Sequence, residues 1–218
     1  MGFIIGLLGV DGSGKTTTGR LVVERLRFSG YEVTYHHEID FFLLKPSFRL
    51  FAKLLRSDRA ENVKENVLMD VDQGRRPYSD IYYILVWLDS FIAYLYFKLS
   101  EKIIIHDRWL YDFTTFFEHK NYKNRFVIML FTIFPRPDLL ILLTVPPEVA
   151  LLRKKDDIAH VNHDLKYYKN MGLKALRNAK RWNCDSIIDA SKPVDKVADD
   201  VLAVINNKIQ LQATSQKY

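Results

Sequence analysis

The sequence has a single cysteine, Cys184, among its 218 residues, which excludes an internal disulfide. So few thiols are typical of proteins from reducing compartments, and we expect a cytoplasmic protein. No motif surrounds Cys184, so we interpret it as a packed thiol. A hydrophobic core must therefore stabilise the fold, and a chain of this length can bury a substantial one.

Long runs of charge of one sign are also missing. The net charge is +6, yet no block of five or six consecutive basic residues occurs. This argues against a nucleic-acid-binding stripe, and we expect no nucleic-acid partner. A modest positive charge suits an enzyme that handles polyanions, although it does not distinguish nucleotides from nucleic acid.

The sequence has no charge-free hydrophobic run long enough to span a bilayer. Residues 1–10 are apolar but lack the basic region and cleavage site of a signal peptide. Residues 81–99 come closest in length, but Asp89 lies at their centre, where a charge costs roughly 2.5–3.5 kcal/mol on insertion scales. We therefore predict a largely buried helix over 81–99 and no association with a membrane.

Residues 9–16 read GVDGSGKT and match the GxxxxGK[ST] pattern of phosphate-binding loops. They follow an apolar run over 3–8 and precede a predicted helix over 15–29, which is the context that gives the pattern its meaning. Glycines let backbone N–H groups turn toward phosphate oxygens, and the helix N-terminus adds unpaired donors. We expect Lys15 to reach the β- and γ-phosphates and the Thr16 hydroxyl to hold Mg²⁺. The predicted triphosphate site comprises Gly9, Asp11, Gly12, Ser13, Gly14, Lys15, Thr16 and Thr17.

Short apolar runs alternate with helical patterns along the rest of the chain. This alternation predicts an α/β protein with a doubly wound, five-stranded parallel sheet flanked by helices. The predicted strands are 3–8, 32–35, 102–106, 139–145 and 186–188. The predicted helices are 15–29, 81–99, one from about 110, 122–134, one from about 147, 165–180 and 194–209.

Residues 1–209 are predicted to form one domain, since no repeat or low-complexity linker divides them. Within this domain we expect residues 41–80 to form a flap on the acceptor side and residues 153–164 to form a short lid. Residues 210–218 are predicted to be a polar, frayed tail.

Histidines and carboxylates follow the predicted second strand, at the edge of the sheet where ligands bind. Adjacent histidines of a strand point to opposite faces, so His36 and His37 cannot share one zinc ion without a bend. We interpret His37, Glu38 and Asp40 as polar groups that line an acceptor pocket.

Asp107 and Arg108 end the predicted third strand. Phosphate-loop enzymes commonly place a carboxylate for a magnesium-bound water at this point, and an adjacent arginine offers a planar fork for phosphate. The alternative is a capping aspartate beside a surface arginine.

Together these pieces resemble thymidylate kinase and its near relatives among the nucleoside monophosphate kinases. Residues 9–17 match the family's phosphate loop closely, and residues 107–109 (DRW) resemble its Asp-Arg-aromatic motif. Residues 137–150 resemble its fourth strand and the entry to its lid, and residues 188–193 resemble the loop beside the adenine. The ordered set covers nearly the whole chain and is more specific than the phosphate loop alone.

The resemblance implies phosphoryl transfer from ATP, with Mg²⁺, to a nucleoside 5′-monophosphate. It implies that Arg108 grips the acceptor phosphate, that Asp107 orients it or a magnesium-bound water, and that Ala190, Ser191 and Lys192 lie beside the adenine. Relatives without an arginine in the phosphate loop use one from the lid, and Ser13 fills that loop position here. Arg153 is therefore the expected clamp, with a solvated basic helix end as the alternative.

The acceptor half departs from the family pattern. Family members usually carry Arg-Glu-Pro after the second strand, where this chain has residues 37–39 (HEI), and an arginine in the middle helix, where it has residues 89–91 (DSF). Residues 110–112 (LYD) replace the segment that follows the Asp-Arg-aromatic motif. The predicted acceptor pocket comprises His37, Glu38, Asp40, Ser90, Arg108 and Tyr111.

Three functions therefore stay open. The first is an ATP-dependent nucleoside monophosphate kinase, and the second is a kinase of the same fold that acts on a sugar or nucleoside. The third is a non-catalytic, nucleotide-binding regulatory protein. The resemblance also suggests a homodimer, for which the predicted helices 81–99 and 122–134 offer an apolar interface.

Overall fold

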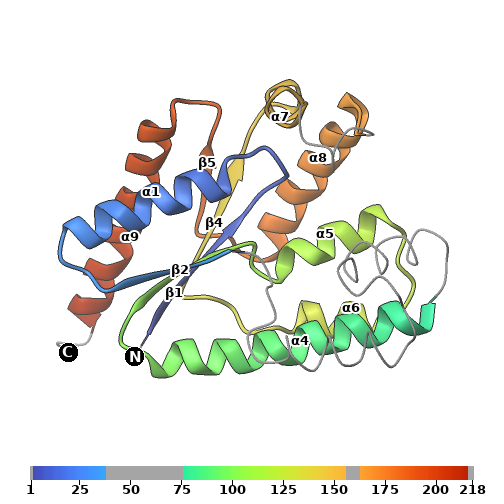
Figure 1. Cartoon of the computed structure of the whole chain (residues 1–218), viewed down its shortest axis with the longest axis horizontal. Coiled ribbons are helices and arrows are strands. Elements are labelled where there is room, and N and C mark those ends of the chain that lie inside the picture. Colours follow the sequence, from blue (N-terminus) through green and yellow to red (C-terminus); the bar gives the residue numbers. More distant parts are fainter. Residues whose placement is uncertain (1, 38–75, 156–162, 216–218) are drawn as a thin grey trace, which may run out of the picture.

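The structure is a computed structural model that describes residues 2–37, 76–155 and 163–215. Five parallel strands form one sheet in the order β2-β3-β1-β4-β5 (Figure 1). The predicted parallel α/β architecture is thereby confirmed. The strands are β1 (Phe3–Leu8), β2 (Val33–His37), β3 (Ile103–Asp107), β4 (Leu139–Thr144) and β5 (Ser186–Asp189).

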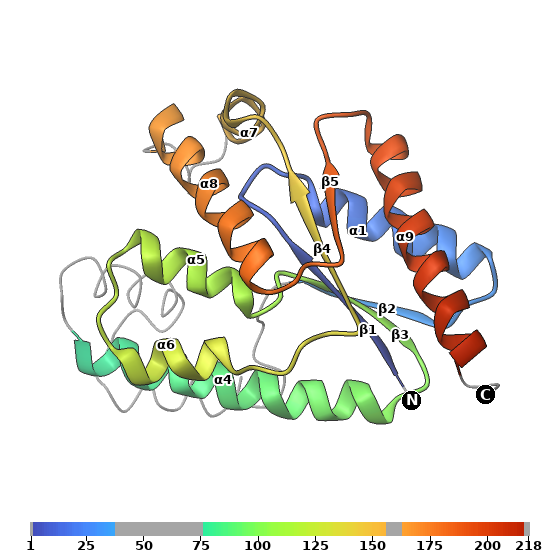
Figure 2. The ribbon, with the colours of Figure 1, turned by 180° about the vertical axis from the view of Figure 1, so that it is seen from behind.

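Side chains alternate along the strands and divide the core into two layers. Ile5 and Leu7 of β1 pack with helices α1 (Lys15–Phe28) and α9 (Val194–Ser215), which lie side by side on one face of the sheet (Figure 1). Ile4 and Leu8 pack on the opposite face. Helices on both faces make the sheet doubly wound. The opposite face is covered by α4 (Arg76–Leu99), α5 (Tyr111–His119), α6 (Arg125–Thr132) and α8 (Leu165–Arg181), as Figure 2 shows from behind.

The parallel strands bring their carboxyl ends to one edge of the sheet. β1 lies between β3 and β4, so the loop that follows it begins where the chain winds in two directions, which is the usual ligand crevice. The register aligns Leu7 of β1 and His37 of β2 with Asp107 of β3. Helix α7 (Pro147–Lys154) follows β4 at this edge and packs against α8.

Several helices begin or end at other residues than the sequence predicted. α4 begins at Arg76, so residues 76–80 are helical rather than part of a flap. α9 extends to Ser215, so the prediction of a frayed tail is wrong for residues 210–215. α6 begins later than predicted because the Asn124 side chain accepts hydrogen bonds from two backbone N–H groups and caps the helix. The remainder of the predicted flap and residues 156–162 of the predicted lid lie outside the described residues.

Helix α4 is more exposed than the sequence predicted. Its stretch Asp80–Leu99 is long and apolar enough to cross a membrane by length and composition, and its mean hydropathy is 1.3. Of the most apolar part of this stretch, 28% is buried in the structure. One side, which carries Tyr83, Val86 and Phe97, packs into the core. The prediction of a largely buried helix is therefore wrong, because packing covers only one side. The other side carries an exposed apolar stripe of Ile81, Leu88, Ile92, Leu95 and Leu99, each at least 40% exposed.

Candidate functional site

The phosphate loop has the backbone conformation that its glycines predict. Gly9, Gly12 and Gly14 have φ angles of 149°, 82° and 86°, which favour glycine. A Cβ on Gly12 would lie 2.8 Å from the carbonyl oxygen of Ala150, so the loop also packs closely against α7. Gly14 is the N-cap of α1 and offers no side chain to the first N–H groups of the helix. These donors suit a bound anion.

A cleft of about 520 Å³ opens between the phosphate loop, the end of β2, the residue after β3 and α7. Its positive lining suits a polyanion such as a triphosphate, because opposite charge concentrates the ligand there. Among the described residues, the charged side chains that line it are four cations and one carboxylate, namely Lys15, Arg108, Arg153, Lys154 and Asp11.

Lys15 lies folded back over its own loop. Its Nζ donates to the carbonyl oxygens of Gly9 at 2.6 Å and Val10 at 3.0 Å, and the residue is 5% exposed. Burial, and then the charge of Arg108, lowers the pKa of Lys15. A phosphate in the loop would supply the opposite charge that neutral carbonyls lack.

Arg108 is held in place through its backbone and its side chain. Its φ of 70° is uncommon for a residue other than glycine, and such conformations cluster at functional sites. Its N–H donates to the carbonyl oxygen of Leu7 on β1 at 3.1 Å. Its guanidinium donates to the Asp11 carboxylate, which fixes the guanidinium at the cleft.

Asp107 is 1% exposed and collects three hydrogen bonds on one oxygen. Its Oδ2 accepts from Thr16 Oγ1 at 2.6 Å, from the Tyr35 hydroxyl at 2.9 Å and from His37 Nδ1 at 2.9 Å. Burial acts to raise the pKa of Asp107, but the Thr16 hydrogen bond, the Lys15 charge and the two β2 contacts together hold it below its usual value. Because the carboxyl is ionised, Nδ1 of His37 is the donor.

The two neighbouring histidines point to opposite faces of β2, as the strand geometry predicts. His36 packs on Phe97 of α4 with a ring-centroid distance of 4.4 Å, whereas His37 contacts Asp107 and lines the cleft. His37 is therefore at the site and His36 belongs to the core layer behind it.

Thr16 and Asp107, the predicted magnesium ligands, are in direct contact. Oδ1 of Asp107 is buried and has no hydrogen-bond partner among the described residues. A spare carboxylate oxygen beside a threonine hydroxyl is the kind of oxygen donor that Mg²⁺ prefers, directly or through its waters. The residues present therefore fit the metal.

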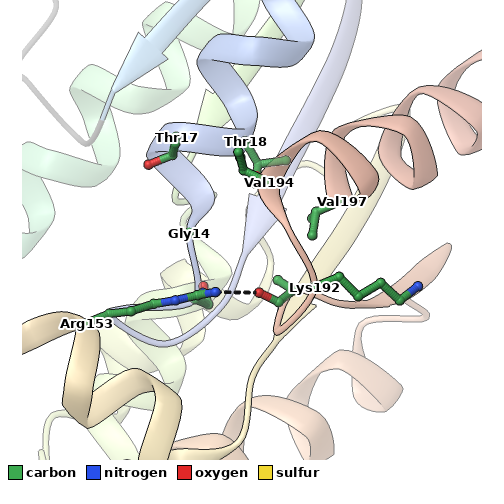
Figure 3. A pocket seen from close by; sticks show the side chains of 9 residues that line it. Gly14, Thr17, Thr18, Arg153, Lys192, Val194 and Val197 are labelled. Atoms are coloured by element: carbon green, nitrogen blue, oxygen red, sulfur yellow. Dashed lines mark hydrogen bonds between the residues drawn. The ribbon is translucent and has the colours of Figure 1, made fainter.

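Arg153 of α7 lines the cleft and also a second cavity of about 220 Å³, which Figure 3 shows. Its guanidinium donates to the carbonyl oxygens of Gly12 at 3.2 Å and Ala190 at 3.0 Å, and so joins the phosphate loop to the loop after β5. Val194 and Val197 of α9 give this cavity an apolar wall.

The remaining residues of the loop after β5 differ in how they face this cavity. Lys192 lines it, but its Nζ points away from Arg153 (Figure 3) and pairs with Asp200. Ser191 is exposed, and its N–H donates to the Asp189 side chain. Of the predicted adenine-side trio, Ala190 is thus linked to the phosphate loop by Arg153, which donates to its carbonyl oxygen.

Two residues at the site were missed by the sequence analysis. Asp112, in the first turn of α5, lines a small cavity of about 70 Å³ beside Asp11 and Arg108. Its Oδ2 is buried without a partner among the described residues, and burial raises the pKa of Asp112 to about 6. An acidic residue in a first helical turn looks like ordinary capping in a sequence.

Tyr35 is the second missed residue, and the sequence alone could have indicated it. Residues two apart on a strand share a face, and His37 was already a candidate.

Two predicted acceptor residues, Tyr111 and Ser90, do not line the cleft, and two others lie outside the described residues. Tyr111 is 5% exposed, its hydroxyl donates to the Phe134 carbonyl oxygen, and its ring stacks on Trp182, so it is part of the core. Ser90 is half-buried in α4 and, within the described part of the chain, lines none of these three cavities. Glu38 and Asp40 lie outside the described residues.

Comparison with known proteins identifies similar chains over almost the full length. The thymidylate kinase family model matches residues 8–201. A probable thymidylate kinase of Pyrococcus abyssi is 24% identical, over 95% of this chain and 98% of the relative. A probable thymidylate kinase of Archaeoglobus fulgidus is 28% identical, over 97% and 99%. The thymidylate kinase of Tropheryma whipplei is 29% identical, over 92% and 94%.

Proposed function

This chain belongs to the thymidylate kinase family, and on that premise we propose that its phosphate acceptor is thymidylate. The chain is an ATP-dependent nucleoside monophosphate kinase, and its substrate is a small-molecule nucleotide. Thymidylate is the acceptor that the names of its relatives indicate. We also propose a cytoplasmic location, because the single cysteine suits a reducing compartment.

On the donor side, we propose that the phosphate loop and α1 bind the triphosphate of ATP. Backbone N–H groups of the loop donate to the phosphate oxygens, and the N-terminus of α1 adds its partial positive charge. Lys15 leaves its two loop carbonyls to neutralise charge that develops on the transferred phosphoryl group. Adenine then occupies the cavity with the Val194 and Val197 wall, next to Ala190.

For the metal, we propose that Thr16 and Asp107 hold Mg²⁺ or its waters. The bound ion would neutralise charge on the β- and γ-phosphate oxygens. The contribution of the chain is to keep the Thr16 hydroxyl and the Asp107 carboxylate together at the carboxyl edge of the sheet.

On the acceptor side, we propose that Arg108 grips the phosphate of the nucleoside monophosphate. Its guanidinium is already oriented by Asp11, and its planar fork matches two phosphate oxygens. Arg153 and Lys154 supply the remaining positive charge from α7, with Arg153 as the clamp over the transferred group. Transfer then depends on positioning and charge neutralisation rather than on a covalent intermediate.

The observation that carries this proposal is the cationic cleft at the switch point of the sheet, with the phosphate loop on one side and Arg108 on the other. A coupled assay for ADP release tests it against a panel of nucleoside monophosphates, nucleosides and sugars. Turnover with thymidylate supports the proposal, whereas turnover only with a nucleoside or a sugar contradicts it. ATP binding without acceptor-dependent ADP release would indicate a regulatory protein instead.

We also propose that the enzyme is a homodimer through the exposed apolar stripe of α4. Its residues are spaced by three, four or seven positions, the spacing that aligns side chains along one side of a helix against a second helix. The neighbouring helix α6 extends this surface with three further apolar side chains, each more than 40% exposed. Exposed apolar surfaces of this kind mark interaction sites, and a second copy offers an identical surface. The three further residues are Phe126 and Met129 of α6 and Ile133, which caps its C-terminus.

A further inference from the structure

The Asp107 carboxylate is bonded unevenly, and this asymmetry is the starting observation. All three of its hydrogen bonds go to Oδ2, while Oδ1 is buried without a partner among the described residues. One donor, Thr16, comes from α1. The other two, Tyr35 and His37, come from β2 and had no assigned role in holding this carboxylate.

Tyr35 and His37 act from the same side of β2. They are two positions apart, so their side chains point the same way, and their rings are nearly parallel at a centroid distance of 6.3 Å. Both reach Oδ2 at 2.9 Å. Two donors on one rigid strand define a direction for the carboxylate, whereas a single hydroxyl would let it rotate about its last bond.

The ring of Tyr35 is itself fixed by α1. A Cβ on Gly19 would lie 2.8 Å from Cε2 of Tyr35, so the ring lies directly on the helix backbone where only glycine leaves room. The guanidinium of Arg20 lies over this ring, 5.9 Å from the ring centroid, in a cation–π contact. Burial, and then the Asp107 charge, raises the pKa of the Tyr35 hydroxyl, which therefore stays protonated and donates.

We infer that Tyr35 and His37 are positioning residues that fix the Asp107 carboxylate on Oδ2 and so leave Oδ1 for the metal that accompanies ATP. This inference rests on the proposed metal role of Asp107. It also changes the assignment of His37, because Nδ1 is committed to Asp107 and only Nε2 is left for the cleft. Such outer partners of a metal-binding carboxylate typically change metal affinity or activity by about 10- to 100-fold when removed.

The test is the coupling between metal and nucleotide in the absence of an acceptor. The dissociation constant of ATP is measured by titration calorimetry once in EDTA and once in saturating Mg²⁺. The dissociation constant in EDTA divided by that in Mg²⁺ is the ratio that reports the coupling. Tyr35→Phe keeps the ring against Gly19 and removes only the hydroxyl. We expect this variant to lower the ratio about 10-fold relative to the wild type, with the dissociation constant in EDTA unchanged within about 2-fold.

Three further variants separate positioning from a loss of packing. Tyr122→Phe removes another tyrosine–carboxylate hydrogen bond, which joins the loop before α6 to Asp80 of α4, and should leave the ratio unchanged. His37→Asn keeps a donor nitrogen close to the place of Nδ1 and should retain most of the coupling, whereas His37→Leu should lose it.

The outcomes distinguish this inference from the proposed function. If the wild type couples Mg²⁺ to ATP but Tyr35→Phe has the same ratio, or if Tyr122→Phe lowers the ratio as much, the positioning role is wrong while the kinase assignment stands. If the wild type itself has a ratio of one, the proposed metal role of Asp107 fails and the inference fails with it. Acceptor-dependent ADP release by the wild type is measured separately and tests the kinase assignment alone.

Discussion

Lys15 is the single residue on which transfer should depend most. Its buried ammonium contacts only carbonyl oxygens of its own loop among the hydrogen bonds described, and a phosphate provides a stronger partner. We expect Lys15→Ala to lower kcat by at least about 100-fold, because it removes positive charge aimed at the transition state. The thermal unfolding curve should change little. Steady-state kinetics beside calorimetry test this, and unchanged activity would refute the phosphate-loop assignment.

Arg108 should act on the acceptor rather than on ATP. We expect Arg108→Ala to raise KM for the acceptor and lower kcat, with little effect on the affinity for ATP. Arg108→Lys is the matched control, since it keeps the charge but loses the planar fork, and it should restore only part of the activity. Calorimetric titration with ATP would contradict this role if the affinity for ATP were the quantity that fell.

Asp112 should make stability depend on pH. Its pKa rises from an ordinary 3.8 to about 6 in the folded protein, so the folded state holds the proton more tightly than the unfolded state. The contribution of Asp112 to the free energy of unfolding is then fully present below about pH 4. It is lost as the pH rises through about 6, because a buried carboxylate must form. We expect Asp112→Asn to gain up to about 3 kcal/mol relative to the wild type between pH 4 and pH 7.

Urea unfolding of the wild type and Asp112→Asn across this pH range measures that difference. Packing changes caused by the amide are common to both pH values and cancel in the comparison. A difference between the two proteins that does not vary with pH would contradict the buried, proton-holding carboxyl.

At the level of single residues, the sequence identified side chains with a motif and missed those that depend on three-dimensional surroundings. The glycines, Lys15 and Thr16 of the loop were predictable because GxxxxGK[ST] has one conformational meaning between a strand and a helix. Tyr111 was assigned to the acceptor, yet it packs on Trp182, because position after a motif does not reveal which way a helix faces. Asp112 became recognisable only once its burial was known.

Among the elements, α4 shows the limits of composition. Its apolar residues predicted burial, but a helix can bury only the side that meets the sheet, and Ile92 and Leu95 stay exposed. Helix ends were also hard to predict. The Asn124 cap shortened α6, and α9 continued through residues of ordinary helix propensity to Ser215.

The exposed stripe of α4 leads to a prediction about assembly. We expect the wild type to sediment as a dimer and the double variant Leu88→Glu/Leu95→Glu to sediment as a monomer, because paired charges would be buried without partners in the interface. Leu173→Glu, at a 60% exposed position on α8, is the matched control and should remain a dimer. Analytical ultracentrifugation decides, and a dimer that survives the double variant would place the interface elsewhere.

At the scale of the whole molecule, the fold was predictable because strand–helix alternation and one loop motif constrain it strongly. The predicted donor-side residues followed from the same features. The predicted acceptor residues did not, because they come from separate elements and two of them, Glu38 and Asp40, lie outside the described residues. One ion pair nevertheless connects the predicted donor and acceptor residues, because the Asp11 carboxylate of the phosphate loop accepts a hydrogen bond from Arg108.

Transfer of the γ-phosphoryl group can be followed directly. ATP labelled in its γ-phosphate is incubated with thymidylate, Mg²⁺ and the wild type, with Lys15→Ala as the matched control, and the products are separated by chromatography. We expect label in thymidine diphosphate with the wild type and at least about 100-fold less with the variant. Label that appears only as inorganic phosphate, or label that stays in ATP, would contradict the proposal that thymidylate is the phosphate acceptor of this chain.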